Sequence, residues 1–554
     1  MNRSAKDSVS VQTVVDWLQG RWGLADSTLQ NTVRDLLLAE SGGDTAILLP
    51  WGQRDPALWG NAANGHPDNL SSPLLVVDRG GDFYLQTRRC YEAERVVAER
   101  IAHFCRDNPV QAGAHLFSEF FPGAGSGDLQ VMAAQTALRS RITLITGGPG
   151  VGKTWTLARI LALFMRTRSV PAEKIALAAP TGKAADRMRD AITGSAKGLD
   201  ASEAESLIRV ASRSSTLHRL LGFNPATGKC HHGLDNRLPW KLLIIDESSM
   251  VDLHLWRVLL DSVADDARLI LLGDPKQLQS VGQGAVFGDL AGHAGKPTSP
   301  LYGRKVHLTV SRRFAECPGI AALAEAMQDD DSESAIGILS ESTGEDGDLV
   351  WIDTGERHPS FDRFPQSLRD SLLHIAREED PAKALKALES ACILTPHRNS
   401  VIGAEALSRG ITRAVAALIP GTRIPNEPVI INRNDPETGL KNGSLGITVT
   451  DDQNRRRTWF HHGNTNRDFS PGALPDHSSA WAITIHRSQG SEYDQVLVIL
   501  PRKESVMATR ELLYTAITRA RKKVIVAGDL DAVKRAVESP SDRLTLLQEA
   551  LSIR

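Results

Sequence analysis

A run of glycines followed by a lysine and a threonine carries the clearest chemistry in this 554-residue sequence. It follows the apolar segment TLIT and precedes the apolar stretch LARILALFM, so we expect a strand, a loop and a helix in that order. In such a loop, glycines let backbone N–H groups turn toward a polyphosphate. The lysine places a charge beside the outer phosphates, and the threonine hydroxyl can bind Mg²⁺ at the start of the helix. The sequence therefore predicts a nucleoside triphosphate site at Gly147, Gly148, Pro149, Gly150, Val151, Gly152, Lys153 and Thr154.

Two adjacent carboxylates give the second chemical signal. Asp246 and Glu247 follow the apolar run Leu242–Ile245, which has the composition of a buried strand. An aspartate at the carboxyl end of such a strand can hold Mg²⁺ together with Thr154, and the neighbouring glutamate can polarise an attacking water. An acidic pair after a core strand also occurs in α/β proteins without this chemistry. The glycine-rich phosphate-binding loop (P-loop) at residues 147–154 favours the interpretation in which the pair takes part in ATP hydrolysis.

Polar residues further along could complete the site. Gln277 follows a third apolar run, Leu269–Leu272, and is a candidate sensor of the outermost phosphate. Arg313 and Arg519 lie in LTVSRRF and LLYTAITRAR, and arginines delivered from a second domain would stabilise charge on the transferring phosphoryl group. Arg312 is the alternative to Arg313.

The spacing of apolar segments indicates the elements that position these residues. Strand-like and helical stretches alternate from Ile142 to about Gly292, which predicts a parallel sheet with helices on both faces. Before them, two strand-like runs joined by GG and an amphipathic segment form a separate module without visible chemistry. The glycine-rich FPGAGSGD is the expected linker between this N-terminal module and the parallel sheet.

The chain resembles the superfamily 1B DNA helicases, and among them the RecD family, the alpha subunits of exodeoxyribonuclease V (RecBCD). The resemblance runs from about Leu74 to about Gly528, and it rests on the ordered segments GGPGVGKT, APTGKAADRM, STLHRLLG, LLIIDESSMVD, LLGDPKQLQSVGQGAVF, HRSQGSEY and LLYTAITRAR. It implies an α/β fold in which two RecA-like P-loop motor domains have parallel sheets. A small SH3-like β insertion in the second motor domain and a mixed N-terminal domain are implied as well. The segment HRSQGSEY departs from the family pattern, because it has Arg at the second position and Tyr at the last, where relatives often have Lys and Phe. Both replacements keep the charge or the aromatic ring. Arg and Lys are nevertheless not interchangeable at a tightly packed site.

The resemblance also assigns nucleotide contacts. Gln130 matches the glutamine that reads the adenine base, although an ordinary surface glutamine at a helix start is equally compatible with the local sequence. Gly490 and Glu492 belong to the ATP site, with Glu492 near the ribose. Arg313 is preferred to Arg312 because it directly precedes Phe314, as in the family. The implied cofactors are ATP and Mg²⁺.

Six residues are implied in binding DNA. Thr181 could instead cap a helix, and His218 could be a packed or surface histidine. His486 is not expected to act as a general base, because Glu247 fills that role. The implied DNA-binding set is Pro180, Thr181, Gly182, His218, Thr484 and His486.

We expect three parts along the chain. Residues 1–121 form an N-terminal partner-docking domain, residues 122–303 the first motor domain, and residues 304–554 the second, with the insertion at about 421–480. The segment 223–240, rich in Pro, Gly and Asn, is a candidate hairpin that could split DNA strands. Asn442 and Gly443 are expected to form a hairpin turn in the insertion, with any DNA role secondary.

Composition limits the remaining choices. With 41% hydrophobic and 23% charged residues, the chain has the composition of a soluble globular protein, and no apolar run approaches the length of a membrane span. Its five cysteines are scattered, as in a reduced intracellular protein. The net charge of -2 means that DNA binding would depend on a local positive groove, because the overall charge does not attract DNA.

Three functions of different classes follow. The first is an ATP-driven 5′-to-3′ DNA helicase subunit that works with RecB-like and RecC-like subunits on DNA ends, in double-strand break repair and recombination in the bacterial cytoplasm near the nucleoid. The second is a stand-alone RecD-like helicase. The third is a non-motor structural or regulatory subunit, which the intact set of catalytic residues disfavours. The sequence shows no cluster of acidic residues with a lysine that would indicate a nuclease site.

Overall fold

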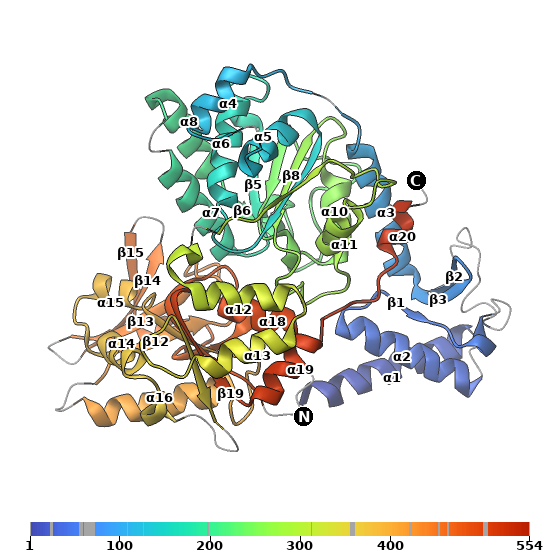
Figure 1. The fold of residues 1–554 in the computed structure, drawn as a ribbon. Coiled ribbons are helices and arrows are strands. Elements are labelled where there is room, and N and C mark those ends of the chain that lie inside the picture. The colour runs from blue at the N-terminus through green and yellow to red at the C-terminus, as the bar shows by residue number, and fades with distance from the viewer. Residues whose placement is uncertain are drawn as a thin grey trace.

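The structure is a computed structural model that describes residues 2–22, 26–54, 59, 72–107, 109–125, 127–196, 199–311, 313–354, 360–419, 424–451, 455–462, 465–501 and 508–552. It contains two parallel sheets, an antiparallel sheet attached to the second of them, and a small N-terminal sheet (Figure 1). The predicted α/β fold with two P-loop-type motor domains, a β insertion and a mixed N-terminal part is confirmed.

The N-terminal part joins a helical pair to a three-stranded antiparallel sheet with strand order β1-β3-β2. Asp26 accepts hydrogen bonds from the backbone N–H groups of Thr28 and Leu29, which starts the second helix, and Gly43 ends it with a φ of 110°. The buried face of α3 packs into the core of the first motor domain beside α10. The elements are α1 (Asn2–Trp22), α2 (Ser27–Gly42), β1 (Ala46–Leu48), β2 (Leu74–Arg79), β3 (Asp82–Thr87) and α3 (Arg88–Phe104). The next helix, α4 (Ala114–Phe120), packs on the core of the first motor domain.

The first motor domain is built on a six-stranded parallel sheet with strand order β6-β5-β7-β8-β4-β9. Strands β4, β5, β7 and β8 are buried along their whole length, as continuous apolar runs in a parallel sheet should be. Helices cover both faces, and the edge strand β9 pairs with β4. The elements are α5 (Leu129–Arg139), β4 (Ile142–Gly147), α6 (Lys153–Arg166), β5 (Ile175–Ala179), α7 (Gly182–Ser195), α8 (Ala201–Ala211), β6 (Ser215–Thr216), α9 (Leu217–Leu220), β7 (Leu242–Ile245), α10 (Leu253–Ser262), β8 (Arg268–Gly273), α11 (Val286–His293) and β9 (Lys305–Leu308).

The second motor domain has a five-stranded parallel sheet with strand order β10-β19-β18-β11-β17. Its two packed faces form separate apolar clusters, one beneath α12, α13, α18 and α19 and one beneath α14, α15 and α16. The elements are α12 (Pro318–Gln328), α13 (Ser332–Glu341), β10 (Leu349–Asp353), α14 (Gln366–Arg377), α15 (Pro381–Ala387), β11 (Ala391–Thr395), α16 (Ala404–Leu418), β17 (Ala482–Thr484), α17 (Ile485–Ser488), β18 (Tyr493–Ile499), α18 (Arg510–Ile517), β19 (Ala520–Gly528) and α19 (Leu530–Glu538).

An antiparallel sheet interrupts this domain between α16 and β17. Its five strands run in the order β15-β14-β13-β12-β16, around a small core that contains Val429, Phe460 and Phe469. Gly443 has a φ of 84°, and the N–H of Ser444 bonds to the carbonyl of Lys441, so Asn442 and Gly443 occupy a tight turn before β13. The strands are β12 (Glu427–Ile431), β13 (Leu445–Thr450), β14 (Arg456–His462), β15 (Thr465–Phe469) and β16 (His477–Ser479).

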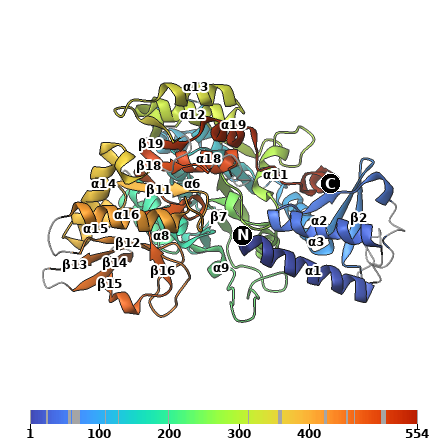
Figure 2. The same ribbon diagram turned by 90° about the horizontal axis from the view of Figure 1, so that it is seen from below.

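The C-terminal segment leaves the second motor domain and returns to the first (Figures 1 and 2). The guanidinium of Arg543 donates hydrogen bonds to the carbonyls of Gly282 and Gly284 at 2.6 and 2.8 Å. The last helix, α20 (Leu547–Ser552), buries Leu547 and Leu551 in the core shared by α3 and the first motor sheet. The C-terminal segment thus links the second motor domain to the first motor domain and to α3. Among the described helices, none is long and apolar enough to cross a membrane.

Candidate functional site between the motor domains

The phosphate loop follows β4 as the glycine pattern predicts. Gly147, Gly150 and Gly152 have φ values of 152°, 78° and 85°, which side-chain-bearing residues rarely adopt. A Cβ on Gly150 would lie 2.3 Å from the Cβ of Arg313, so only glycine allows the segment that contains Arg313 to lie this close to the loop. The Lys153 amine donates to the carbonyls of Gly147 and Gly148 at 2.6 and 2.9 Å, at the start of α6.

The predicted carboxylate pair lies at the end of β7, beside the loop. Asp246 accepts a hydrogen bond of 2.8 Å from the backbone N–H of Glu247. Burial, followed by the nearby charge of Glu247, raises the pKa of Asp246 to about 6. Glu247 has a φ of 51°, an unusual conformation for a non-glycine residue that turns the chain sharply at the end of the strand.

Mg²⁺ fits this donor set. Thr154 and Asp246 both line the same cavity, and Mg²⁺ prefers oxygen ligands from one or two carboxylates combined with substrate phosphates. Among the described residues no three His, Cys, Asp or Glu side chains gather into a metal cluster, so an all-protein cage of these ligands is not formed there.

Gln277 and Arg519 meet across the domain boundary. The Arg519 guanidinium donates a hydrogen bond to the side-chain oxygen of Gln277 at 3.1 Å. It also donates a hydrogen bond to the backbone carbonyl of Thr515 at 3.0 Å, which holds it in place. Arg519 is only 3% exposed, and burial lowers its pKa. Asp274 lies behind Gln277 and accepts from both the Gln277 amide and the Tyr514 hydroxyl at 3.2 Å. Sequence reasoning gave Asp274 and Tyr514 no role; only their cross-domain contact shows that they support the site.

Arg313 approaches the same cavity from the linker that follows β9. It begins a short 3₁₀ turn (Arg313–Glu316), and its guanidinium forms an ion pair of 2.5 Å with Glu492. The neighbouring Ser311 donates to the carbonyl of Pro149 in the phosphate loop at 3.2 Å. Arg312, the alternative from the sequence, lies outside the described residues.

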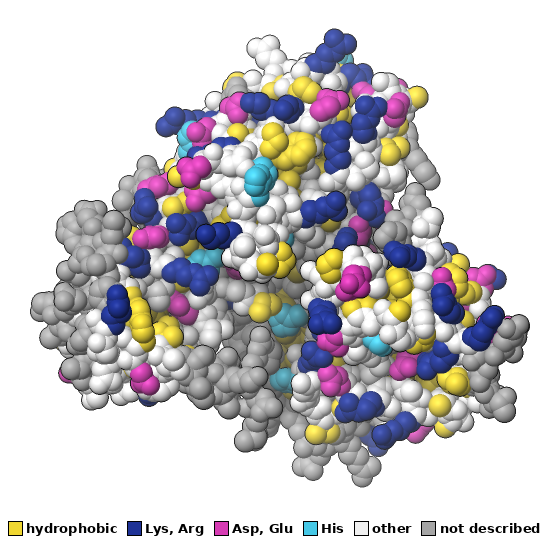
Figure 3. Space-filling view, turned by 180° about the vertical axis from the view of Figure 1, so that it is seen from behind, with side chains coloured by type: hydrophobic (Ala, Val, Ile, Leu, Met, Phe, Trp, Pro, Cys, Tyr) yellow, Lys and Arg dark blue, Asp and Glu magenta, His cyan; other side chains and the backbone are white. Residues whose placement is uncertain are grey.

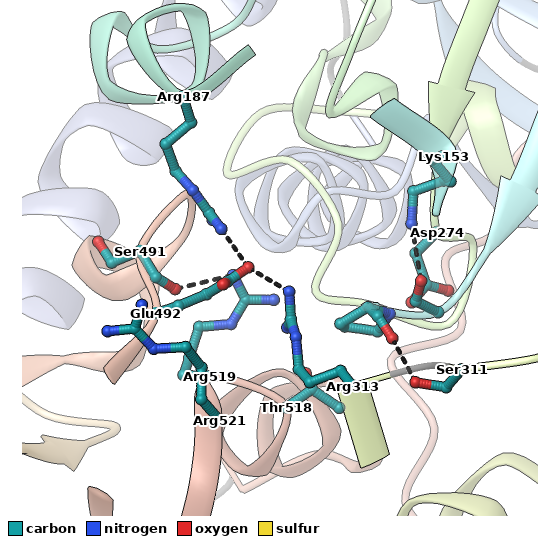
Figure 4. Close-up of polar contacts among 12 residues, drawn as sticks. Lys153, Arg187, Asp274, Ser311, Arg313, Ser491, Glu492, Thr518, Arg519 and Arg521 are labelled. Atoms are coloured by element: carbon teal, nitrogen blue, oxygen red, sulfur yellow. Dashed lines mark hydrogen bonds and ion pairs between the residues drawn. The ribbon is translucent and has the colours of Figure 1, made fainter. Parts of the chain in front are cut away.

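Arg187 is a functional candidate that the sequence reading missed. It projects from α7 of the first motor domain and forms an ion pair with Glu492 on the side opposite Arg313 (Figure 4). Burial acts against the ionised form of Glu492, but the charges of Arg187 and Arg313 outweigh it and lower the pKa to about 2. The signal was present in the helical spacing, because Ala184, Arg187, Met188 and Ala191 share one face of α7 and all line the cavity.

Gln130 lies against the phosphate loop at the start of α5. Its side-chain nitrogen is 3.5 Å from the carbonyl oxygen of Val151, and a Cβ on Gly152 would come within 2.8 Å of it. Gly490 approaches from the second domain with a φ of 71°. Trp155, not singled out from the sequence, also lines the cavity and stacks beneath the guanidinium of Arg159 at 3.4 Å.

One cavity of about 300 Å³ collects these side chains from both motor domains. The predicted residues that line it are Pro149, Gly150, Gly152, Lys153, Thr154, Asp246, Glu247, Gln277, Arg313, Gly490, Glu492 and Arg519. Gly147, Gly148 and Val151 complete the loop itself.

A second hollow, of about 350 Å³, lies between the first motor domain and the insertion. Thr181 caps α7 by accepting from the Ala184 N–H at 3.2 Å, and His218 is exposed and packs edge-on against Phe223. Lys441 and Asn442 close the hollow from the insertion. Four of the predicted DNA-binding residues therefore meet here: Pro180, Thr181, Gly182 and His218.

The other two predicted DNA contacts lie elsewhere. Thr484 ends β17, beside Thr395 at the end of the paired strand β11, and His486 is in the short helix α17. Neither is among the residues that line the hollow. Near the hollow, Asn224 and Lys229 form an antiparallel bridge in the loop after α9, which projects from the body of the molecule (Figure 2).

Charge on the described surface is mixed. On the face in Figure 3, Lys and Arg side chains are interspersed with Asp and Glu. A positive site for DNA would thus have to be local, as the net charge of -2 suggests.

Comparisons with known proteins agree with this architecture. An AAA domain family matches residues 130–283, and a UvrD-like helicase C-terminal domain family matches residues 479–527.

The RecBCD enzyme subunit RecD of Mycolicibacterium smegmatis is 36% identical over 512 residues, which cover 91% of this chain and 88% of that protein. The Haemophilus influenzae RecBCD enzyme subunit RecD is 30% identical over 89% of this chain and 84% of its own length. The ATP-dependent RecD2 DNA helicase of Deinococcus radiodurans is 31% identical over 71% of this chain but 47% of its own length. The chain with this two-domain nucleotide cavity belongs to the RecD family of RecBCD enzyme subunits.

Proposed function

We propose that this protein is an ATP-driven DNA helicase subunit that moves 5′-to-3′ along single-stranded DNA within a RecBCD-type complex. Its partners are RecB-like and RecC-like subunits and its substrate is a DNA end, in double-strand break repair and homologous recombination in the bacterial cytoplasm. The observation that carries the proposal is the single cavity in which phosphate-loop residues of one motor domain face Arg519 of the other. Such a site can convert nucleotide turnover into relative movement of two domains.

We assign the nucleotide roles to residues of the phosphate loop and of this cavity. Lys153 and the loop N–H groups hold the phosphates, while Thr154 and Asp246 hold Mg²⁺, which neutralises phosphate charge when bound. Glu247 orients and polarises the attacking water. Gln277 contacts the outermost phosphate and connects it to Arg519 through the hydrogen bond between them.

Arg313 and Arg519 stabilise the charge that develops during transfer of the phosphoryl group. Arg313 must exchange its ion pair with Glu492 for the phosphate, which leaves the Glu492 carboxylate available to the ribose. After hydrolysis these contacts across the cavity are lost and the two domains separate.

DNA binding is assigned to the hollow lined by Pro180, Thr181, Gly182 and His218, and to Thr484 and His486 on the second motor domain. If the two groups grip alternately, each turnover advances the strand. The loop around Asn224 and Lys229 is the candidate wedge for splitting the duplex. We also propose the division at residues 1–121, 122–303 and 304–554, except that β9 and α20 belong with the first motor domain, and the first part docks on the partner subunits.

The stand-alone helicase is the alternative. The Mycolicibacterium smegmatis RecD subunit is 36% identical over 91% of this chain, whereas the Deinococcus radiodurans RecD2 helicase is 31% identical over 71% of it, which favours the subunit. A purely structural role is disfavoured because Lys153, Asp246, Glu247, Gln277 and Arg519 all line one cavity.

The test is unwinding of duplexes that carry either a 5′ or a 3′ single-stranded tail, by the purified chain and by its complex with the partner subunits. We expect opening of the 5′-tailed duplex with Mg²⁺ and ATP, and loss of this activity in Lys153→Ala. Opening of only the 3′-tailed duplex would contradict the direction. Activity only in the complex would identify an obligate subunit, and absence in both would contradict the motor role.

A further inference from the structure

Helix α7 runs along three hollows that follow one another between the two halves of the molecule. A middle cavity of about 300 Å³ separates the nucleotide cavity from the candidate DNA hollow. It shares Arg187, Gly490 and Glu492 with the first, and Lys441 and Asn442 with the second. The nucleotide and DNA sites are therefore connected along this helix.

Two consecutive residues of α7 form ion pairs across this boundary in different directions. Arg187 pairs with Glu492 of the second motor domain at the nucleotide end. Asp186 pairs with Lys441 of the insertion at 3.3 Å, at the DNA end. Adjacent positions on a helix point about 100° apart, which is why one short stretch reaches both partners.

The two partners belong to one packed unit. Ile447 and Val449 of β13 in the insertion are buried in the same apolar cluster as Ile393, Leu497 and Ile525 of the second motor sheet. Close-packed cores transmit displacements instead of absorbing them. A shift of Glu492 relative to α7 will therefore also move Lys441 relative to α7.

Lys441 covers the part of α7 that faces the DNA hollow. A Cβ added to Gly182 would lie 2.3 Å from the Cδ of Lys441, so this side chain lies directly on the first turn of the helix. Helix N-termini present free N–H groups that favour phosphate, and a lysine amine can bind a phosphate as a point charge. A DNA phosphate in the hollow and the Asp186 carboxylate thus compete for Lys441.

We propose that Asp186 and Arg187 are positioning residues that couple nucleotide occupancy to the grip on DNA, Arg187 through Glu492 and Asp186 by holding Lys441 over the first turn of α7. A nucleotide that draws Arg187 and Arg313 away from Glu492 lets the second half shift, and the shift moves Lys441 with it. DNA that binds Lys441 releases Asp186 and loosens the same boundary. The inference rests on the proposed motion on DNA driven by ATP.

The test measures the affinity of the full-length chain for a fluorescent oligothymidylate, with and without a saturating non-hydrolysable ATP analogue. The ratio of the two dissociation constants is the coupling factor, and linkage requires DNA to change analogue affinity by the same factor. Without nucleotide, we expect Asp186→Asn to tighten DNA binding by about two- to fivefold, because an ion pair this exposed is weak. In Asp186→Asn and in Lys441→Gln, the coupling factor should lie about two- to fivefold closer to one than it does in the wild-type chain.

Asp190→Asn is the matched control. It removes a carboxylate from the same helix that, like Asp186, pairs with Arg189: the ion pair of Asp190 is 3.2 Å long and that of Asp186 is 2.8 Å long. The control therefore also matches the loss of one partner of Arg189. It therefore reports the general effect of losing one negative charge near DNA. In a Lys441→Gln background, Asp186→Asn should tighten DNA binding no more than Asp190→Asn does.

Three results would overturn the inference: a wild-type coupling factor in Asp186→Asn, tightening equal to that of Asp190→Asn, or tightening that persists in full without Lys441. Each applies when the wild-type chain binds DNA and hydrolyses ATP. A wild-type protein that does neither, alone or in its complex with the partner subunits, would contradict the proposed function itself, so the two failures are distinguishable.

Discussion

The Arg519 guanidinium of the second motor domain donates a hydrogen bond of 3.1 Å to the side-chain oxygen of Gln277 in the first. Gln277 is also held by Asp274, which in turn accepts from Tyr514 of the second domain. A second contact nearby joins the Leu278 N–H to the Thr515 hydroxyl at 2.8 Å. Gln277, the proposed phosphate sensor, and Arg519, the arginine proposed to stabilise the transition state, are therefore parts of one hydrogen-bonded network across the domain boundary.

This network predicts that Gln277 and Arg519 act as a unit. Gln277→Ala and Arg519→Ala should each lower DNA-stimulated kcat by about 100-fold or more, since each removes an interaction made to the transferring group. The double variant should lose much less than the product of the two effects, because each substitution already breaks the shared contact. A steady-state ATPase assay on the four proteins gives the answer, and multiplicative losses would show that the residues work independently.

Replacing Glu247 should separate ATP binding from hydrolysis. Glu247→Gln keeps the shape of the side chain but removes the charge that polarises water, so we expect kcat to fall by about 10²–10⁴-fold while ATP affinity changes only severalfold. Single-turnover hydrolysis and equilibrium nucleotide binding measure the two quantities. Glu205→Gln, on the exposed face of α8 and paired with Arg209, is the matched control and should behave as wild type. Equal loss of binding and hydrolysis would remove Glu247 from the water-activating role.

Asp246 should set the acid limit of activity. Its pKa of about 6 means that the carboxyl is protonated below that pH and cannot bind Mg²⁺, so ATPase activity should fall as the pH drops through 6. Higher Mg²⁺ favours the ionised form, so a tenfold increase in Mg²⁺ should move the acid limb of kcat/KM to lower pH. An acid limb that does not respond to Mg²⁺ would assign it to another group.

The buried Glu94 should make stability depend on pH. Burial raises its pKa from 4.5 to about 7, although Thr45, Gln86 and the Leu546 N–H all donate hydrogen bonds to it. The folded state therefore binds more protons than the unfolded state between these pH values, and its stability falls as the pH rises through this window. The whole effect is about 3 kcal/mol for a shift from 4.5 to about 7.

Glu94→Gln isolates this contribution, because the amide is neutral at every pH. The thermal midpoint of the variant relative to wild type should rise as the pH is raised from 5 to 8. The Gln86 side-chain oxygen has no hydrogen-bond partner in the structure, so the Gln86 amide can turn to accept a hydrogen bond from the introduced amide. A difference in thermal midpoint that stays constant with pH would show that Glu94 does not bind the extra proton of the folded state.

Much of the nucleotide site could be predicted from the sequence because its parts are local. The phosphate loop, Asp246 and Glu247 each follow a buried strand of one parallel sheet, and the carboxyl ends of such strands meet at one edge. The glycine pattern fixes the loop conformation directly, through the positive φ values of Gly150 and Gly152. The antiparallel insertion was likewise visible as short strand-like runs separated by turns.

Tertiary structure alone decided which distant residues meet. Arg187 is an ordinary helical arginine in sequence, and only the approach of Glu492 from the second domain places it in the site. Strand β9 joins the first sheet, and α20 packs on the first motor domain, although both lie within residues 304–554, the segment expected to form the second. These contacts join residues hundreds of positions apart, so they depend on how whole domains pack, and the local sequence does not specify the partner.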